Sequence, residues 1–138
     1  MDIKKHITAL GFVPKDGTNG IYHKIYVDYA IEIDFEKQSI NYGGGITADS
    51  KTTQNFSDAE NFVVLECVDR LLTKGYKPQN LILEKTWPSG HGTSGRLDIC
   101  VNREDGTPYM LIECKTYGKE YNKELARIRK DGGQLFTY

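Results

Sequence analysis

The chain has few cysteines, and their spacing suits neither metal nor disulfide chemistry. Its 138 residues contain three, Cys67, Cys100 and Cys114, with no CxxC pair. An odd number of distant cysteines fits neither a disulfide framework nor a zinc knuckle. We therefore interpret all three as small, buried, apolar residues in a reducing compartment.

Long hydrophobic runs are also missing. No apolar run approaches the roughly 20 residues of a membrane span. The start, MDIKKHITAL, lacks the apolar stretch and small-residue cleavage site of a signal peptide. No GKS or GKT follows a glycine-rich loop, so Walker-type nucleotide hydrolysis is not supported. These absences predict a cytoplasmic protein without a membrane partner.

The chain as a whole has no large excess of positive or negative charge, because its net charge is only −1. The two halves nevertheless differ, since residues 1–66 carry a net −4 and residues 67–138 a net +3. The window 115–130 alone carries +4, a local field that attracts phosphate groups. A solvated helix face is the commoner explanation of such a window, so the charge alone does not identify a partner.

What is present is the pattern of one globular α/β domain, with 38% hydrophobic and 27% charged residues. Residues 2–10 predict a short amphipathic helix. Residues 20–44, rich in Tyr and Ile, predict a small antiparallel meander. Residues 43–55 are rich in Gly and Thr and predict a flexible loop. Together these elements give an N-terminal part, residues 1–56.

The C-terminal part, residues 57–138, predicts a core of helices and strands. SDAENFVVLECVDRLLTKG is the strongest helix signal, with Ser57 as N-cap and Gly75 as the stop. Asp105-Gly106 predicts a hairpin turn between two strands. The remaining expected elements are strands at 80–87, 95–101 and 109–116 and a second amphipathic helix at about 118–131.

Three ionisable side chains converge in this arrangement. Asp98 lies in the middle of the strand GRLDICV. Glu113 and Lys115 lie at the end of the strand that is hairpinned to it, and their spacing of two places them on one face. We therefore expect two carboxylates and an ammonium to meet between neighbouring strands.

One carboxylate from each of two adjacent strands suits a hard divalent cation such as Mg²⁺, with Mn²⁺ as a substitute, and the backbone carbonyl of Cys114 adds a third oxygen. Lys115 lies two residues beyond a carboxylate and can orient an attacking water. Such a set of groups can hydrolyse a phosphodiester bond. Taken singly, Asp98 could instead be a hydrogen-bonded acid at a strand edge, and Glu113 and Lys115 an exposed ion pair of little energetic value.

Glu66 is a fourth candidate. It lies within NFVVLECVDRLL, a helix that is apolar on nearly all sides, where an unpaired carboxylate would be expensive to bury. A nearby cation would explain its presence. Equally, Glu66 can lie at the surface and pair with Arg70, one helical turn later.

These residues resemble the PD-(D/E)xK nuclease superfamily, through GRLD at 95–98, a hairpin, ECK at 113–115 and a glutamate on the preceding helix. The resemblance implies a restriction-endonuclease-like α/β core, a central mixed sheet flanked by helices. It implies that Asp98 and Glu113 bind Mg²⁺, that Lys115 is the catalytic base or positions the water, and that Glu66 is an accessory acid. Leu97 stands where the superfamily's name has proline.

The ending QLFTY resembles the QxxxY motif of the RecB-like branch, which implies that Gln134 and Tyr138 face the site and bound DNA. Residues 57–138 as a whole resemble the N-terminal nuclease domain of type I restriction R-subunit-like or fused restriction-modification enzymes. The resemblance implies a metal-dependent endodeoxyribonuclease that acts on double-stranded DNA. We expect the chain to continue into methyltransferase, translocase or specificity domains. A RecB-like repair nuclease and a non-cleaving DNA-binding module are the alternatives.

DNA contacts are expected in two places. The glycine-rich segment WPSGHGTSGR can grip phosphates through backbone amides, although its histidine is more typical of an ordinary loop residue. The second helix carries a basic row spaced by four residues. The predicted DNA contacts are Ser89, His91, Ser94 and Arg96 in the segment and Lys119, Lys123 and Arg127 on the helix.

Overall fold

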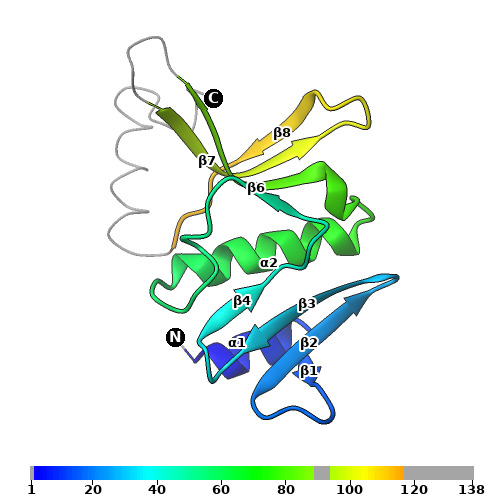
Figure 1. Ribbon diagram of the computed structural model, residues 1–138, viewed down its shortest axis with the longest axis vertical. Helices are drawn as coiled ribbons and strands as arrows, with labels where there is room; N and C mark the ends of the chain where they lie inside the picture. Colours follow the sequence, from blue (N-terminus) through cyan, green and yellow to red (C-terminus); the bar gives the residue numbers. More distant parts are fainter. Residues whose placement is uncertain (1, 89–93, 117–138) are drawn as a thin grey trace.

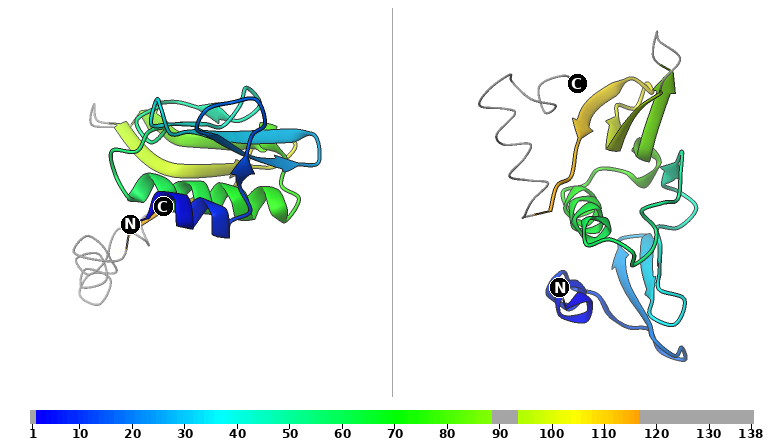
Figure 2. Two further views of the ribbon diagram at one scale, coloured as in Figure 1. Left: turned by 90° about the horizontal axis from the view of Figure 1, so that it is seen from below. Right: turned by 90° about the vertical axis from the view of Figure 1, so that its left-hand side faces the viewer.

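The computed structural model describes residues 2–88 and 94–116, and for Trp87, Pro88 and Ser94 it describes the backbone only. The helix expected at 118–131 and the ending QLFTY lie outside these residues. The described chain forms two four-stranded sheets (Figure 1). Seen from below, helices α1 and α2 both lie on one side of the strands (Figure 2, left). The predicted α/β class and restriction-endonuclease-like core are confirmed.

The first sheet is the expected antiparallel meander. Helix α1 (Ile3–Ala9) precedes it, and the Asp2 side chain caps this helix by accepting the Lys5 N–H at 3.1 Å. The strands follow one another in the order of the sequence, each paired with the next. They are β1 (Val13–Pro14), β2 (Ile21–Tyr26), β3 (Tyr29–Asp34) and β4 (Ser39–Asn41).

The segment 43–55, expected as a flexible loop, contains a short strand, β5 (Thr47–Ala48). β5 pairs in parallel with β6 (Leu81–Pro88) and so belongs to the second sheet. The Tyr29 hydroxyl fixes the approach to β5 by accepting the N–H groups of Gly45 at 3.1 Å and Ile46 at 3.0 Å. A two-residue strand has no periodicity to detect, so the sequence could not show it.

Helix α2 spans Glu60–Thr73, and Ser57 is not its N-cap. The Ser57 hydroxyl donates instead to Asn55 Oδ1 at 2.5 Å, while the Asp58 carboxylate accepts the Glu60 N–H at 2.9 Å. The N-cap is Ala59, which has no side chain able to cap, so the predicted serine cap is wrong. The helix ends as expected before Gly75, whose φ is +101°.

The second sheet has the order β5-β6-β7-β8. A 3-10 turn (Pro78–Asn80) leads into β6, and β7 (Ser94–Asn102) pairs antiparallel with β6 and with β8 (Pro108–Ile112). The predicted hairpin turn is confirmed, with Gly106 at φ +87°. Strand β8 is shorter than expected, so Glu113 and Lys115 lie just beyond its end.

Both sheets share one hydrophobic core with α2, which runs between them in Figure 1. Ile33 comes from the first sheet, Leu65 from the helix and Ile99 from the second sheet, and each is 0% exposed. The three cysteines are free thiols, Cys100 and Cys114 buried as expected and Cys67 only partly buried. No helix of the described residues is long and apolar enough to cross a membrane.

Candidate active site

The β7–β8 hairpin brings Asp98 to the end of β8. Its register pairs Cys100 with Leu111 and Ile99 with Ile112, so Glu113, the first residue beyond β8, follows next to Asp98. At this point the Cys114 backbone N–H donates to Asp98 Oδ2 at 2.7 Å. The Asp98 side chain therefore holds the chain beyond β8 in place, and the sequence-predicted convergence is present.

Lys115 is the cation nearest to Glu113 in this group. Its Nζ lies 3.7 Å from Glu113 Oε1, and the two side chains are 20% and 14% exposed. This distance is beyond a good hydrogen bond. The other carboxylate oxygen, Glu113 Oε2, is buried and has no hydrogen-bond partner among the described residues. A buried carboxylate oxygen without a partner is rare and calls for a ligand or a proton.

Burial and mutual repulsion disturb both carboxyl groups. Burial raises the pKa of Glu113 to about 7, and the charge of Asp98 adds to this rise while Lys115 opposes it. Burial also raises the pKa of Asp98, against the opposing effects of the Cys114 N–H and Lys115. The group therefore holds more negative charge than one lysine offsets, which favours binding of either a proton or a cation.

The donor atoms suit a hard divalent cation. Asp98 and Glu113 supply carboxylate oxygens, and the Cys114 carbonyl is the third oxygen expected from the sequence. Among residues 2–88 and 94–116 there is no group of three or more His, Cys, Asp or Glu side chains placed to hold a metal. Mg²⁺ does not require such a group, because it keeps several waters and binds through one or two carboxylates. The Glu113 oxygen that has no partner among the described residues is the observation that supports binding of such a cation.

Glu66 takes the surface placement that the sequence left open. Its side chain is 33% exposed, and its carboxylate lies 3.0 Å from Arg70 Nη2 and 3.8 Å from His6 Nε2. A different acid of the same helix acts on the site, because the charge of Glu60 contributes to the raised pKa of Glu113. The helical acid near the site therefore lies at the first residue of α2, not in its middle.

Of the predicted DNA contacts, Arg96 is the one whose side chain is described. Arg96 lies two residues before Asp98 on β7, so both side chains project from the same face. Its side chain is 58% exposed. Ser94 is described by its backbone alone, within β7. The other predicted DNA-contacting residues and two predicted catalytic residues lie outside the described residues: Ser89, His91, Lys119, Lys123, Arg127, Gln134 and Tyr138.

Glu84 is a buried acid that sequence reasoning missed. It lies on β6 and is 1% exposed. The register pairs Leu83 with Ile99 and Lys85 with Leu97, which puts Glu84 opposite Asp98. Its signal was an acid inside the otherwise apolar start of LILEKTW, the same kind of signal that pointed to Glu113.

A hollow of about 380 Å³ lies elsewhere, between the β2–β3 turn and the end of α2. Tyr26, Tyr29 and Tyr76 line it. None of Asp98, Glu113 and Lys115 is among its lining residues. The acidic site is therefore separate from this hollow.

Comparison with known proteins gives one family match. A search of curated protein sequences finds no match. Residues 59–130, just over half of the chain, match the family described as type I restriction enzyme R protein N terminus. The match begins at the start of α2 and includes β6, β7, β8 and the acidic site. The chain therefore belongs to the type I restriction enzyme R protein N-terminus family.

Proposed function

We propose that the chain is the Mg²⁺-dependent endonuclease domain of a bacterial restriction-modification system and hydrolyses phosphodiester bonds of double-stranded DNA. The observation that carries this proposal is the meeting of Asp98, Glu113 and Lys115, with one buried Glu113 oxygen lacking a partner in the described part of the chain. The family match supports the proposal, because a restriction enzyme R protein belongs to a DNA-directed system.

Asp98 and Glu113 are the proposed Mg²⁺ ligands, with the Cys114 carbonyl as a further oxygen. Asp98 keeps the Cys114 segment in place through the 2.7 Å bond from the Cys114 N–H. When bound, Mg²⁺ supplies positive charge to the scissile phosphate and lowers the pKa of a bound water. The raised pKa of Glu113, about 7, means that a proton competes for its carboxylate near neutral pH.

Lys115 is the proposed catalytic base or water-positioning residue. Its side chain is 20% exposed and its Nζ lies 3.7 Å from Glu113 Oε1, so its position is restricted without a full hydrogen bond. An ammonium held in this way can orient an attacking water or stabilise charge that develops on the phosphate. Gln134 and Tyr138, which the RecB-like resemblance implies face the site, belong to the same proposal.

The finer assignment to the PD-(D/E)xK superfamily rests on the order of helix, hairpin, Asp98, Glu113 and Lys115. Double-stranded DNA is the proposed partner of the site. The proposed polypeptide partners are methyltransferase, translocase or specificity domains of the restriction system. A non-cleaving DNA-binding module is the alternative, and Mn²⁺ titration combined with plasmid cleavage distinguishes it from a nuclease.

The first experiment is calorimetric titration of Mn²⁺, as a substitute for Mg²⁺, at pH 8, where Glu113 is largely ionised because its pKa is about 7. We expect the parent chain to bind Mn²⁺ and Asp98→Asn to bind it at least about tenfold more weakly. Glu36→Gln is the matched control, because Glu36 is an exposed acid of the β3–β4 turn whose bond from Asn19 an amide oxygen can keep. Circular dichroism confirms that all three are folded.

Equal Mn²⁺ binding by the parent and Asp98→Asn, or none by the parent even with a DNA duplex present, would contradict the metal site. Lys115→Met separates binding from chemistry. It should keep Mn²⁺ binding, and it should lose about 10²–10⁴-fold in the cleavage rate of a supercoiled plasmid with Mg²⁺. Metal binding without plasmid cleavage by the parent would favour the non-cleaving module.

A further inference from the structure

Glu84 is a buried acid for which the proposed metal chemistry has no use. It is 1% exposed, in the middle of β6, and its backbone has φ +52°. This left-handed conformation is uncommon for a residue other than glycine, and it persists where the surroundings hold it. Glycine would adopt it freely, whereas a glutamate has to be held in it by its surroundings.

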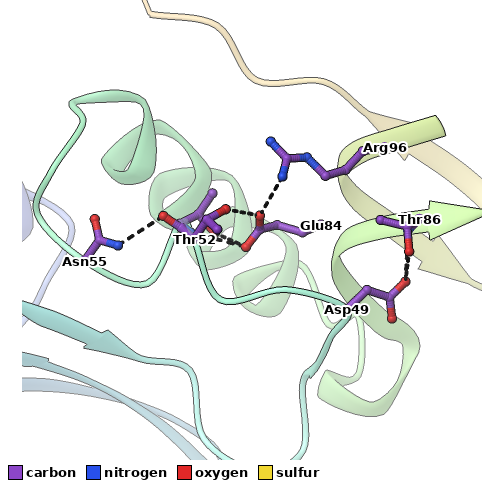
Figure 3. Close-up of polar contacts among 7 residues, drawn as sticks. Asp49, Thr52, Asn55, Glu84, Thr86 and Arg96 are labelled. Atoms are coloured by element: carbon purple, nitrogen blue, oxygen red, sulfur yellow. Dashed lines mark hydrogen bonds and ion pairs between the residues drawn. The ribbon is translucent and has the colours of Figure 1, made fainter. Parts of the chain in front are cut away.

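The Glu84 carboxylate joins β6 to the loop that follows β5. It accepts the Thr52 hydroxyl on one oxygen (Figure 3). The other oxygen accepts the N–H and the hydroxyl of Thr53, both at 3.2 Å. In a second contact the acceptor belongs to the loop and the donor to β6, because the Asp49 carboxylate Oδ2 accepts the Thr86 N–H at 2.9 Å. The loop and β6 are therefore held together by reciprocal bonds.

Arg96 is the cation that approaches this buried carboxylate. Its Nη1 lies 3.5 Å from Glu84 Oε1, and its side chain is 58% exposed, whereas that of Glu84 is 1% exposed (Figure 3). The buried Glu84 carboxylate therefore contacts one edge of the Arg96 guanidinium, whose side chain is otherwise largely exposed to solvent. The separation is longer than a charge-assisted hydrogen bond, so the contact orients the guanidinium without using its whole hydrogen-bonding capacity.

The location of this guanidinium relates it to the acidic site. Arg96 and Asp98 project from one face of β7, and Glu84 stands opposite Asp98 on β6. Arginine presents a planar set of donors that matches the oxygens of a phosphate. An arginine held beside two carboxylates that are proposed to act on a phosphodiester is placed for the DNA backbone at the same site.

We infer that Glu84 is a positioning residue, which holds Arg96 so that its guanidinium binds a DNA backbone phosphate beside Asp98. The inference rests on the proposed function in taking double-stranded DNA as the substrate. It assigns no direct DNA contact to Glu84. Thr52 and Thr53 keep the carboxylate in place, and the charge of Glu84 acts on DNA only through Arg96.

The test is fluorescence anisotropy of a labelled 20-base-pair duplex in EDTA, where no divalent cation can contribute, over a series of salt concentrations. Arg96→Gln should weaken binding about tenfold and reduce the slope of log affinity against log salt by about one. Arg96→Lys keeps the charge but loses the planar donors, so it should weaken binding several-fold with the slope unchanged. Arg70→Gln, which removes an exposed arginine of α2 that pairs with Glu66, is the matched control.

Glu84→Gln gives the sharpest result, because two explanations predict opposite signs. Removing a negative charge should strengthen DNA binding if Glu84 only repels phosphate. If Glu84 positions Arg96, Glu84→Gln should weaken binding about three- to tenfold and add little to Arg96→Gln in the double variant. The amide oxygen of glutamine can still accept from Thr52 or Thr53, so the loop is retained.

Unchanged or tighter binding by a folded Glu84→Gln would overturn the inference, and so would absence of duplex binding by the parent at low salt. If Glu84→Gln does not fold, the two Arg96 variants decide, and parental affinity in both would overturn it. These readouts need no metal. A failed Mn²⁺ titration with the duplex results intact would therefore reject the nuclease proposal alone, and the reverse pattern would reject this inference alone.

Discussion

Two groups of buried charge in this molecule have opposite characters. In the Asp69 cluster, formed by Asp69, Lys24 and Tyr26, Asp69 Oδ1 accepts the Lys24 ammonium and the Tyr26 hydroxyl, each at 2.6 Å. Lys24 also donates to the Leu10 carbonyl at 2.6 Å. In the Asp98 cluster, formed by Asp98, Glu113 and Lys115, two carboxylates share one lysine that lies 3.7 Å from Glu113.

The difference separates an acid whose charge is fully paired within the fold from acids whose charge is only partly paired. The Asp69 cluster joins α2 to the first sheet, and its charges are paired one to one at hydrogen-bond length. The Asp98 cluster has an excess negative charge and a buried oxygen without a partner in the described chain. A disturbed pKa of the kind seen for Glu113 marks functional sites more often than structural ones, and here the geometry agrees with it.

The largest difference is expected when each cluster loses its lysine. Lys24→Met leaves the carboxylate of Asp69 buried without its cation, and we expect a loss of about 3 kcal/mol in the free energy of unfolding. Lys115→Met should change that free energy by less than about 1 kcal/mol, since its contact is long and the carboxyl groups can take up protons. Urea unfolding at pH 7 measures both. Equal losses would remove the distinction between the clusters.

The pH dependence of stability should come from the Asp98 cluster. The pKa of Glu113 is raised from 4.5 to about 7 in the folded protein, so the folded state binds this proton more tightly than the unfolded state. Stability from this group is therefore complete below pH 4.5 and is lost as the pH rises through 7, by up to about 3 kcal/mol. The raised pKa of Asp98 acts in the same direction.

Denaturant unfolding between pH 4.5 and 8.5 tests this dependence, and Glu113→Gln should flatten it. Mn²⁺ should restore stability above pH 7 and have little effect at pH 5, because the proton and the cation compete for the same carboxylate. Stability that rises with pH over this range, in the parent but not in Glu113→Gln, would contradict the assignment.

A smaller effect, again with opposite signs in the two clusters, is expected from removing one carboxylate charge. Asp98→Asn relieves the repulsion on Glu113, and asparagine can still accept the Cys114 N–H, so stability at pH 8 should rise by about 1 kcal/mol. Asp69→Asn removes the counter-charge of Lys24 and should lower it. Unfolding at pH 8 compares the two, and a marked loss in Asp98→Asn would mean that its carboxylate is structural.

The parts of the fold that carry a long periodic pattern could be predicted from the sequence. Helix α2, the meander and the β7–β8 hairpin with its Asp105-Gly106 turn all follow from hydrophobic spacing and turn chemistry. Strand β5 could not be predicted, because two residues contain no period and its pairing with β6 is a long-range contact. The predicted helix cap failed for a different, local reason, since the Ser57 hydroxyl donates to Asn55 two residues earlier.

The candidate site divides in the same way. The sequence was sufficient to predict that Asp98, Glu113 and Lys115 lie close together, because a hairpin determines which residues of its two strands are neighbours. Which acid of α2 acts on them depends on how the helix is rotated and placed against the sheet, and this is set by packing that a single helix sequence does not specify. The role of Glu84 could not be predicted from the sequence, since its placement depends on a left-handed backbone and on two threonines from the segment expected to be flexible.

The choice between Glu60 and Glu66 gives the smallest predicted effect. The charge of Glu60 raises the pKa of Glu113, so Glu60→Gln should lower the midpoint of the Glu113 titration by about a few tenths of a pH unit. Glu66→Gln should leave that midpoint unchanged, because Glu66 pairs with Arg70 at the surface. For Glu66→Gln the free energy of unfolding should change by less than about 0.5 kcal/mol, as is usual for an exposed pair within a helix.

Carbon-detected NMR of the Glu113 carboxyl group, recorded against pH for the two variants and the parent, resolves shifts of this size. The matched substitutions remove the same charge from one helix at positions six residues apart, so any difference reports position alone. A larger shift in Glu66→Gln than in Glu60→Gln would make Glu66 the accessory acid after all, and would require its pair with Arg70 to open in solution.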